Sequence, residues 1–172
     1  DYVYWTEIAA HASGVAGSVW RTDVVLFNQT DQNAMVEFIL HQDSGNVTID
    51  GNVDAASQGV FEDIVGLMNL TGKGALEICS DQPLQAIGRI YNVGDEGSFG
   101  QFLDGVDYSG MAAGDSGRLL GLRQMTGEFR TNISATNSGM TEAEVEISLF
   151  STDGTELETY SLMVGSGMVV QD

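Results

Sequence analysis

Short runs of β-branched and aromatic residues alternate with polar turns along this chain. Residues 24–27 and 35–40 are two such runs of strand length, and the polar residues 28–33 between them predict a turn. Later runs predict further strands at 74–78, 84–91 and 97–102, and residues 64–68 predict one short helical turn. About seven short strands with regular turns indicate an all-β sandwich.

The pattern of the first part of the chain returns 109 residues later. Residues 20–23 (WRTD) are matched by residues 129–132 (FRTN), and without any gap 11 of the 44 positions from 20 to 63 are identical in the second copy. Agreement of this length that includes turn residues indicates a duplicated structural unit. In this alignment Ser57 matches Ser166, Val60 matches Val169, and Asp63 matches Asp172.

The second copy contains strand and turn signals of its own. Residues 144–150 alternate charged and apolar side chains, which is the period of a half-buried strand. Residues 152–155 (TDGT) predict a hairpin turn, as residues 43–46 (DSGN) do in the first copy. The second copy has no counterpart of residues 64–108. We therefore predict a complete β-sandwich unit at 1–110 and a half-length unit at 111–172.

An arginine next to an aromatic residue recurs at the same position of both copies. We interpret it as a structural clamp, in which the arginine binds turn carbonyls or a carboxylate while the aromatic ring is buried. The six residues of this clamp are Trp20, Arg21, Thr22, Phe129, Arg130 and Thr131.

Charge and cysteine content narrow the classes of partner. The chain has 25 acidic residues against one lysine and five arginines, a net charge of −19. This field repels nucleic acid and anionic membrane surfaces, so neither is an expected partner. No apolar run approaches the roughly 18 residues of a membrane span. Cys79, the one cysteine, lies in an apolar run and is expected to be a small buried side chain.

Candidate chemistry is sparse. Residues 114–117 (GDSG), His11 and Asp63 imitate the motifs of chymotrypsin-like proteases. Only ten residues precede the histidine and no disulfide can form, so we expect no triad and no enzyme. The two histidines, His11 and His41, have no zinc spacing. We expect no cofactor; calcium at Asp50 and Asp54, or at Asp104 and Asp107, is the one alternative, and solvated turn acids are favoured over it.

Several segments together resemble a family of bacterial modules. They are residues 10–14 (AHASG) leading to 20–28 (WRTDVVLFN), 72–76 (GKGAL), 98–102 (SFGQF), and 121–124 (GLRQ) before 129–132 (FRTN). These segments resemble the tandem immunoglobulin-like β-sandwich modules of secreted and cell-surface bacterial proteins. The resemblance covers most of the chain and implies location and architecture, with surface, adhesive or structural roles. The second module lacks its closing strands.

We therefore expect a non-catalytic extracellular or cell-surface protein that is structural or adhesive. A half-sandwich exposes strand edges, which strands of another chain could complete, so copies of itself are the expected partners and a fibre the expected assembly. The plainer alternative is that these 172 residues are a fragment of a longer chain. The apolar N-terminal segment formed by Tyr2, Val3, Tyr4 and Trp5 is the candidate donor, and a strand packed into a neighbouring core is the favoured structural alternative for it. The alternative function is calcium-assisted polysaccharide binding, with an exposed aromatic row on one sheet face as its sign.

Overall fold

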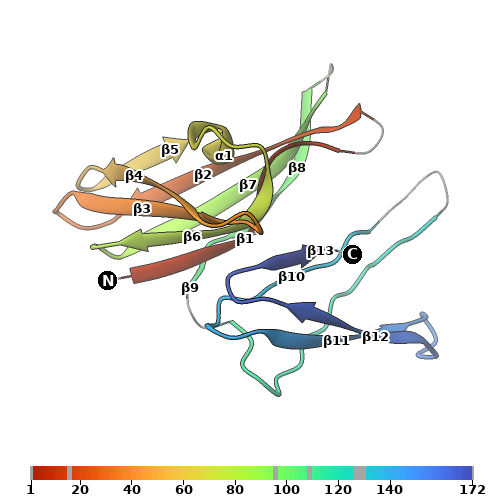
Figure 1. The fold of residues 1–172 in the computed structure, drawn as a ribbon. Helices are drawn as coiled ribbons and strands as arrows, with labels where there is room; N and C mark the ends of the chain where they lie inside the picture. The colour runs from red at the N-terminus through yellow and green to blue at the C-terminus, as the bar shows by residue number, and fades with distance from the viewer. Residues whose placement is uncertain (1, 15–16, 95–96, 108–109, 126–130, 172) are drawn as a thin grey trace. The chain divides into compact units, whose positions relative to one another are not determined.

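The fold was analysed in a computed structural model that describes residues 2–14, 17–94, 97–107, 110–125 and 131–171, the backbone alone for 106–107. The structure is all-β, as the sequence predicts, with one helical turn at α1 (Ile64–Leu67) where residues 64–68 predict it. Two compact units are present, unit 1 at Asp1–Gly110 and unit 2 at Met111–Asp172. Figure 1 shows both units.

Unit 1 is a set of antiparallel strands arranged in two layers (Figure 1). One layer has the order β4-β3-β6-β1, with β9 on the outer edge of β1, and the other has β5-β2-β7-β8. The strands are β1 (Tyr2–Ser13), β2 (Val19–Asn28), β3 (Ala34–His41), β4 (Val47–Val53), β5 (Ser57–Phe61), β6 (Gly72–Ser80), β7 (Leu84–Gly94), β8 (Gly97–Asp104) and β9 (Val106–Asp107).

Strand β1 belongs to both layers. Its first ten residues pair with β6, through a bulge between Thr6 and Ala9, and its last two pair with the start of β2. A bulge bends a strand and increases its twist, which allows β1 to cross from one layer to the other. The crossing closes one side of the sandwich.

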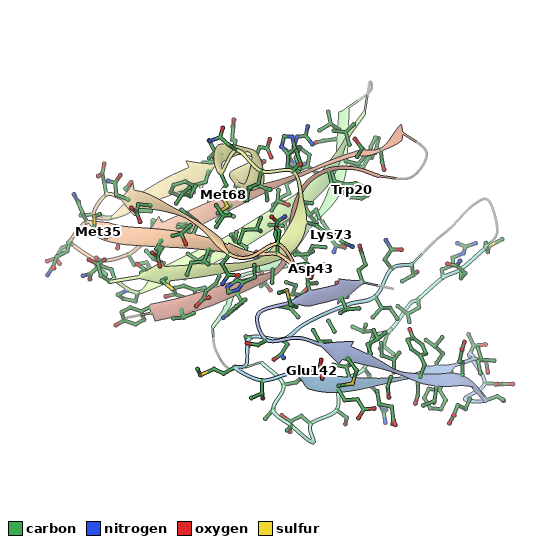
Figure 2. All side chains as sticks on the ribbon, viewed as in Figure 1. Trp20, Met35, Asp43, Met68, Lys73 and Glu142 are labelled. Carbon is green, nitrogen blue, oxygen red and sulfur yellow. The ribbon has the colours of Figure 1, made fainter. Side chains whose placement is uncertain are left out.

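The core of unit 1 lies between the two layers (Figure 2). Period-two alternation fixes which side chains enter it. On β3 the buried residues are Ala34, Val36, Phe38 and Leu40, and on β2 they are Thr22, Val24, Leu26 and Asn28. Met35 alternates with Ala34 and Val36 on β3 and is 59% exposed. Ile64 and Val65 of α1 are also fully buried. The helical turn is therefore part of the core of unit 1.

Unit 2 contains two antiparallel pairs of strands. β11 (Ala143–Phe150) pairs with β12 (Glu156–Val164), and β10 (Ser134–Thr136) pairs with β13 (Val169–Gln171). These repeat the β3–β4 and β2–β5 pairs of unit 1, because β11 lies 109 residues after β3 at both ends. The predicted hairpin turns also match: the N–H of Gly45 donates to Gln42 O (2.9 Å), and that of Gly154 to Ser151 O (3.0 Å).

Beyond this turn the offset between the two copies changes from 109 to 111. Ala34 pairs with Val53 in unit 1, whereas its counterpart Ala143 pairs with Val164 in unit 2, two residues later than a constant offset requires. The left-handed residues follow the new offset, since Ala56 (φ 50°) corresponds to Gly167 (φ 71°). The gapless matches of Ser57 with Ser166 and of Val60 with Val169 are therefore wrong, because β12 has two more residues than β4. Asp172, the predicted match of Asp63, lies outside the described residues.

Candidate functional site

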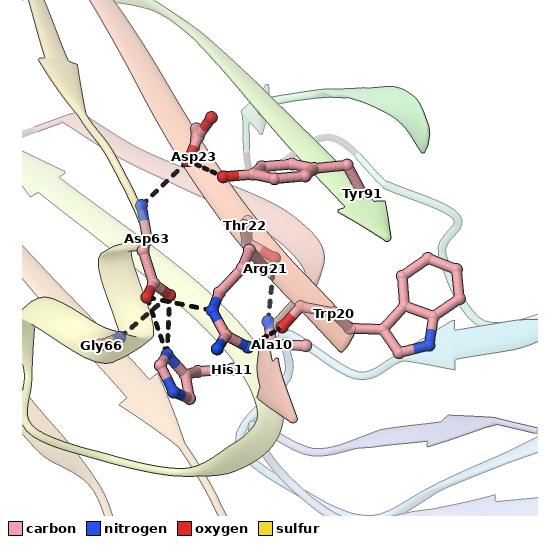
Figure 3. Close-up of polar contacts among 9 residues, drawn as sticks. All are labelled: Ala10, His11, Trp20, Arg21, Thr22, Asp23, Asp63, Gly66 and Tyr91. Carbon is pink, nitrogen blue, oxygen red and sulfur yellow. Dashed lines mark hydrogen bonds and ion pairs between the residues drawn. The ribbon is translucent and has the colours of Figure 1, made fainter. Parts of the chain in front are cut away.

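A cluster of polar side chains gathers where β1 crosses between the layers, and Asp63 is at its centre (Figure 3). Asp63 follows β5 and precedes α1 in a left-handed conformation (φ 47°, ψ 58°). Its carboxylate accepts a hydrogen bond from the backbone N–H of Gly66 (3.3 Å), so it caps the helical turn. Its own N–H donates to an Asp23 carboxylate oxygen (2.9 Å).

Two basic side chains reach the Asp63 carboxylate from neighbouring strands (Figure 3). Nδ1 of His11, on β1, lies 2.8 and 3.0 Å from its two oxygens. Nε of Arg21, on β2, lies 3.3 Å from one of them, and Nη1 of Arg21 donates to Trp20 O at 2.7 Å. Arg21 thus contacts both a carboxylate and a carbonyl.

A second set of contacts extends the cluster to β7 (Figure 3). The Tyr91 hydroxyl donates to the Asp23 carboxylate at 3.0 Å. Burial raises the pKa of Tyr91 above its ordinary value of 10, and the hydrogen bond to Asp23 and the negative charges of Asp23 and Asp63 raise it further. The backbone N–H of Ala10 donates to the hydroxyl of the fully buried Thr22 at 2.9 Å. The cluster therefore fastens β1, β2, β7 and the β5–α1 turn together.

The same cluster borders a shallow, open depression of about 280 Å³. The lining residues are His11, Ala12, Ser13, Arg21, Thr71 and Gly72. A histidine whose Nδ1 faces a carboxylate supplies two of the three members of a serine-protease triad. The structure thus brings together His11 and Asp63, which in the sequence only imitate protease motifs. Ser116, the nucleophile of that motif, belongs to unit 2 and is exposed. The Asp63 carboxylate is shared with Arg21 and a helix N-terminus, which gives it a structural role.

The residues of the predicted arginine clamp differ in burial and in their contacts. Thr22 is buried, but the Trp20 ring is only half-buried, with Nε1 donating to Ser18 Oγ at 3.1 Å, so the expectation of a buried ring is wrong there. Phe129 and Arg130 lie outside the described residues. The Thr131 hydroxyl accepts from Arg123 N (3.1 Å) and donates to Arg123 O (2.8 Å). Thr131 thus holds an upstream backbone in unit 2, as Thr22 does in unit 1.

The N-terminal segment Tyr2, Val3, Tyr4 and Trp5 is part of β1 and pairs with β6 of the same unit. Tyr4 is 8% exposed, and its hydroxyl accepts a hydrogen bond from Leu84 N at 2.8 Å. The Trp5 ring stacks on His41 (5.0 Å between centroids), and Nε2 of His41 lies 2.8 Å from Glu77. In this structure the candidate donor segment is therefore an integral strand of unit 1.

Asn28 and Asn137 are structural hubs that the sequence presents only as one identity of the repeat. Nδ2 of the fully buried Asn28 donates to the carbonyls of Gln32 (2.7 Å), Val53 (3.3 Å) and Asp54 (3.2 Å). Nδ2 of Asn137 donates to Thr141 O (2.7 Å) and Val164 O (2.9 Å). The amide oxygens accept from the backbone N–H two residues ahead, at 3.0 and 2.9 Å. A buried amide with several satisfied bonds fixes the turn between the two ladders.

Cys79 is half-buried, so the expectation of a small buried side chain is wrong. Leu76 and Ile78 of β6 face the core, and alternation directs Glu77 and Cys79 to the outer face. Desolvation raises the pKa of the Cys79 thiol to about 11, and the charge of Glu77 and a contact with it (3.7 Å) add to the effect. A thiol with a raised pKa is mostly protonated at neutral pH, and the protonated form is a poor nucleophile.

Among the described residues, no group of three or more His, Cys, Asp or Glu side chains is placed to hold a metal ion. Of the calcium candidates, Asp54 accepts from Asn52 Nδ2 at 3.4 Å, and the Asp107 side chain is not described. Within the described ranges no helix has the length and apolar character needed to cross a bilayer.

Comparisons with known proteins provide one structural likeness. No family model matches the chain, and no curated protein matches it. A solved structure titled "Crystal Structure of Thermotoga maritima 1070" aligns with a TM-score of 0.51 at 16% identity, covering 61% of this chain and 92% of that one. At this identity the likeness concerns the fold alone. Its extent is close to the share of unit 1, which is 110 of 172 residues.

Proposed function

We propose that this chain is a non-catalytic structural or adhesive protein of the bacterial cell exterior, built from immunoglobulin-like β-sandwich units. It acts as a subunit of a surface fibre in which strands from one chain complete the sandwich of another. The observation that carries the proposal is that unit 2 repeats the β2–β5 and β3–β4 ladders while its described residues provide no strands at the positions of β6 and β7.

The exposure of the inner-face side chains supports this proposal. Val36, Phe38 and Leu40 of β3 are 2%, 0% and 0% exposed in unit 1. Their counterparts Val145, Ile147 and Leu149 on β11 are only partly buried. In unit 1, β6 pairs with β3 on the edge away from β4, whereas the described residues of unit 2 place no strand on the matching edge of β11. An uncovered apolar sheet face marks an interaction surface.

The charge of the chain gives the proposed assembly a testable salt dependence. Chains that each carry −19 repel one another at low ionic strength. The screening length falls from about 30 Å at 0.01 M salt to about 10 Å at 0.1 M. Contacts through apolar strand faces are therefore expected to strengthen as salt is added, whereas contacts through ion pairs would weaken.

Sedimentation velocity and negative-stain microscopy over a range of protein and salt concentrations test the fibre. The wild-type chain is compared with Ile147→Asp, which places a charge on the inner face of β11, and with Ser148→Asp on the outer face of the same strand. We expect filaments or large oligomers for the wild type and Ser148→Asp, and monomers for Ile147→Asp. A wild type that stays monomeric at high salt and high concentration would refute the fibre. Deleting the N-terminal segment is a poorer test, because it removes a core strand.

Polysaccharide binding is the second candidate function, and one surface feature favours it. On the outer face of the β2–β7–β8 layer, Phe102 is 72% exposed beside Arg89, whose guanidinium lies 4.5 Å above the Tyr91 ring. Exposed rings can stack on sugar faces. A glycan array probed with and without chelator tests this, using Phe102→Ala as the matched variant. An absence of binding in both conditions counts against this function.

A further inference from the structure

β8 is the outermost strand of its layer in unit 1 (Figure 1). One of its edges pairs with β7 along its whole length, from Gly97 to Asp104, in a single register. Among the described residues, no strand pairs with its other edge. Each copy of the chain therefore presents the free edge of an eight-residue strand.

The pairing with β7 identifies the backbone groups on this free edge. The N–H of Gly105, directly after β8, donates to Ala86 O at 2.9 Å, so these two residues form a hydrogen-bonded pair. Hydrogen-bonded and non-hydrogen-bonded pairs alternate along an antiparallel ladder, so the odd-numbered residues of β8 bond to β7. The even-numbered residues direct their N–H and C=O groups away from β7. These residues are Ser98, Gly100, Phe102 and Asp104.

The free edge of β8 lacks the features that keep edge strands apart. Exposed edges are protected by charged side chains, proline, bulges or short length. Residues 97–103 (GSFGQFL) of β8 contain no charge and no proline. All residues of β8 except Leu103 are exposed, including Phe99 (68%) and Phe102 (72%). The other edges are protected, because β4 carries Asp50, β5 has five residues and β9 has two.

We propose that two copies of the chain pair with each other through the free edges of their β8 strands. A second copy fits this edge because residues 97–103 are uncharged in a chain of −19, so two copies repel least where these stretches meet. It also brings an edge of the same kind, which is free in every copy. The unpaired N–H and C=O groups of each strand are then satisfied by the other.

The uncharged stretch fixes the register of this pair. Antiparallel pairing about a two-fold axis aligns residues 97–103 with themselves when Gly100 lies opposite Gly100 of the second copy. Phe99 then lies opposite Gln101 of the second copy, and the two Phe99 rings are diagonal neighbours within reach of each other. The β5-β2-β7-β8 layers of the two copies form one continuous sheet.

The pair goes beyond the proposed fibre. It is isologous, so it closes after two copies and makes no fibre by itself. One strand edge is a smaller contact than a standard interface, so the dimer is expected at about 0.1–1 mM chain, and Ile147→Asp stays monomeric below that range. The dissociation constant should fall as salt is added, because screening weakens the repulsion between the two chains.

The experiment compares two substitutions of Phe102 in the full chain that carries Ile147→Asp, so that filaments do not obscure the dimer. Phe102→Val and Phe102→Pro both remove the ring, but only proline also removes an N–H of the free edge. That N–H is not bonded to β7, and proline is tolerated at such edge positions. Sedimentation equilibrium at high salt should give a dissociation constant at least roughly tenfold higher for Phe102→Pro than for Phe102→Val. Equal constants, or an Ile147→Asp chain that is monomeric at about 1 mM, would overturn the inference.

Amide hydrogen exchange locates the contact without any substitution in β8. As the concentration of the Ile147→Asp chain rises, the N–H groups of Ser98, Gly100 and Phe102 should gain protection. The odd-numbered residues of β8 should be protected at all concentrations, because they bond to β7. Protection gained only outside β8 would overturn the inference. This pattern in a chain that forms no fibres would keep the β8 pair and refute the fibre, whereas wild-type fibres without new protection in β8 would refute the pair and keep the fibre.

Discussion

The substitution Asn28→Asp tests whether the buried amide holds the turn of unit 1. The change is isosteric, but it replaces the Nδ2 donor by an oxygen that faces the carbonyls of Gln32, Val53 and Asp54 at 2.7, 3.3 and 3.2 Å. A hydrogen bond contributes about 1 kcal/mol net, so three lost bonds cost about 3 kcal/mol. The burial of a carboxylate against carbonyl oxygens adds to this loss.

Asn137→Asp is the matched control in the same molecule. Asn137 holds the equivalent turn of unit 2 through two carbonyls and is partly exposed. Trp5 and Trp20, the two tryptophans of the chain, both belong to unit 1. Urea unfolding followed by tryptophan fluorescence therefore reports the stability of unit 1 in both variants.

With a urea dependence of about 2 kcal/mol/M, a loss of about 3 kcal/mol lowers the midpoint by about 1.5 M. We expect this shift for Asn28→Asp and an unchanged tryptophan transition for Asn137→Asp. A shift below about 0.3 M for Asn28→Asp would refute the role of the amide as a hub, since surface substitutions cost about as much. Equal shifts for the two variants would refute the independence of the units.

Three further outcomes follow from the polar clusters of unit 1. The raised pKa of Tyr91 predicts that its phenolate absorbance at 295 nm appears above pH 10, and Asp23→Asn should lower this pKa. Because the pKa is higher in the folded than in the unfolded protein, the stabilisation from this hydroxyl is complete below the ordinary pKa of tyrosine and is lost as the pH rises through the pKa of the folded protein. With a pKa of about 11, Cys79 should react with iodoacetamide at pH 8 roughly 100-fold more slowly than in urea, and Glu77→Gln should increase the rate. Gly66→Ala should lower the melting temperature, because its Cβ would overlap the carboxylate of Asp63, the N-cap of α1. An unchanged melting temperature would contradict the capping role of Asp63.

Local patterns predicted most of the strands, because alternation depends only on neighbouring residues. The runs at 24–27, 35–40 and 144–150 became β2, β3 and β11. Alternation also predicts the correct orientation of Cys79: Leu76 and Ile78 face the core, so the thiol must face outward. The expectation of a buried thiol followed hydrophobicity instead of period and was therefore wrong.

The polar cluster could not be predicted in the same way. His11 and Asp63 are 52 residues apart in sequence, and they meet only because β1 crosses between the layers near the end of β5. The crossing depends on a bulge at residues 6–9, which no local pattern in the chain announces. The contacts of Thr22 with Ala10 and of Tyr91 with Asp23 likewise arise from the packing of strands.

The two-residue insertion in unit 2 preserves the alternation of the first copy, so a gapless alignment still matches apolar with apolar positions after the insertion. An insertion of two residues leaves every side chain on its original face, whereas an insertion of one would turn the apolar set toward solvent. Phe38 pairs with Ile49 in unit 1, and Ile147 pairs with Tyr160 in unit 2. The aromatic residue has moved to the other strand while the pair keeps one aromatic and one aliphatic member. Such an exchange conserves the side-chain volume at one place in the core. The exchange is visible only when Tyr160 is aligned with Ile49, which requires an offset of 111 residues.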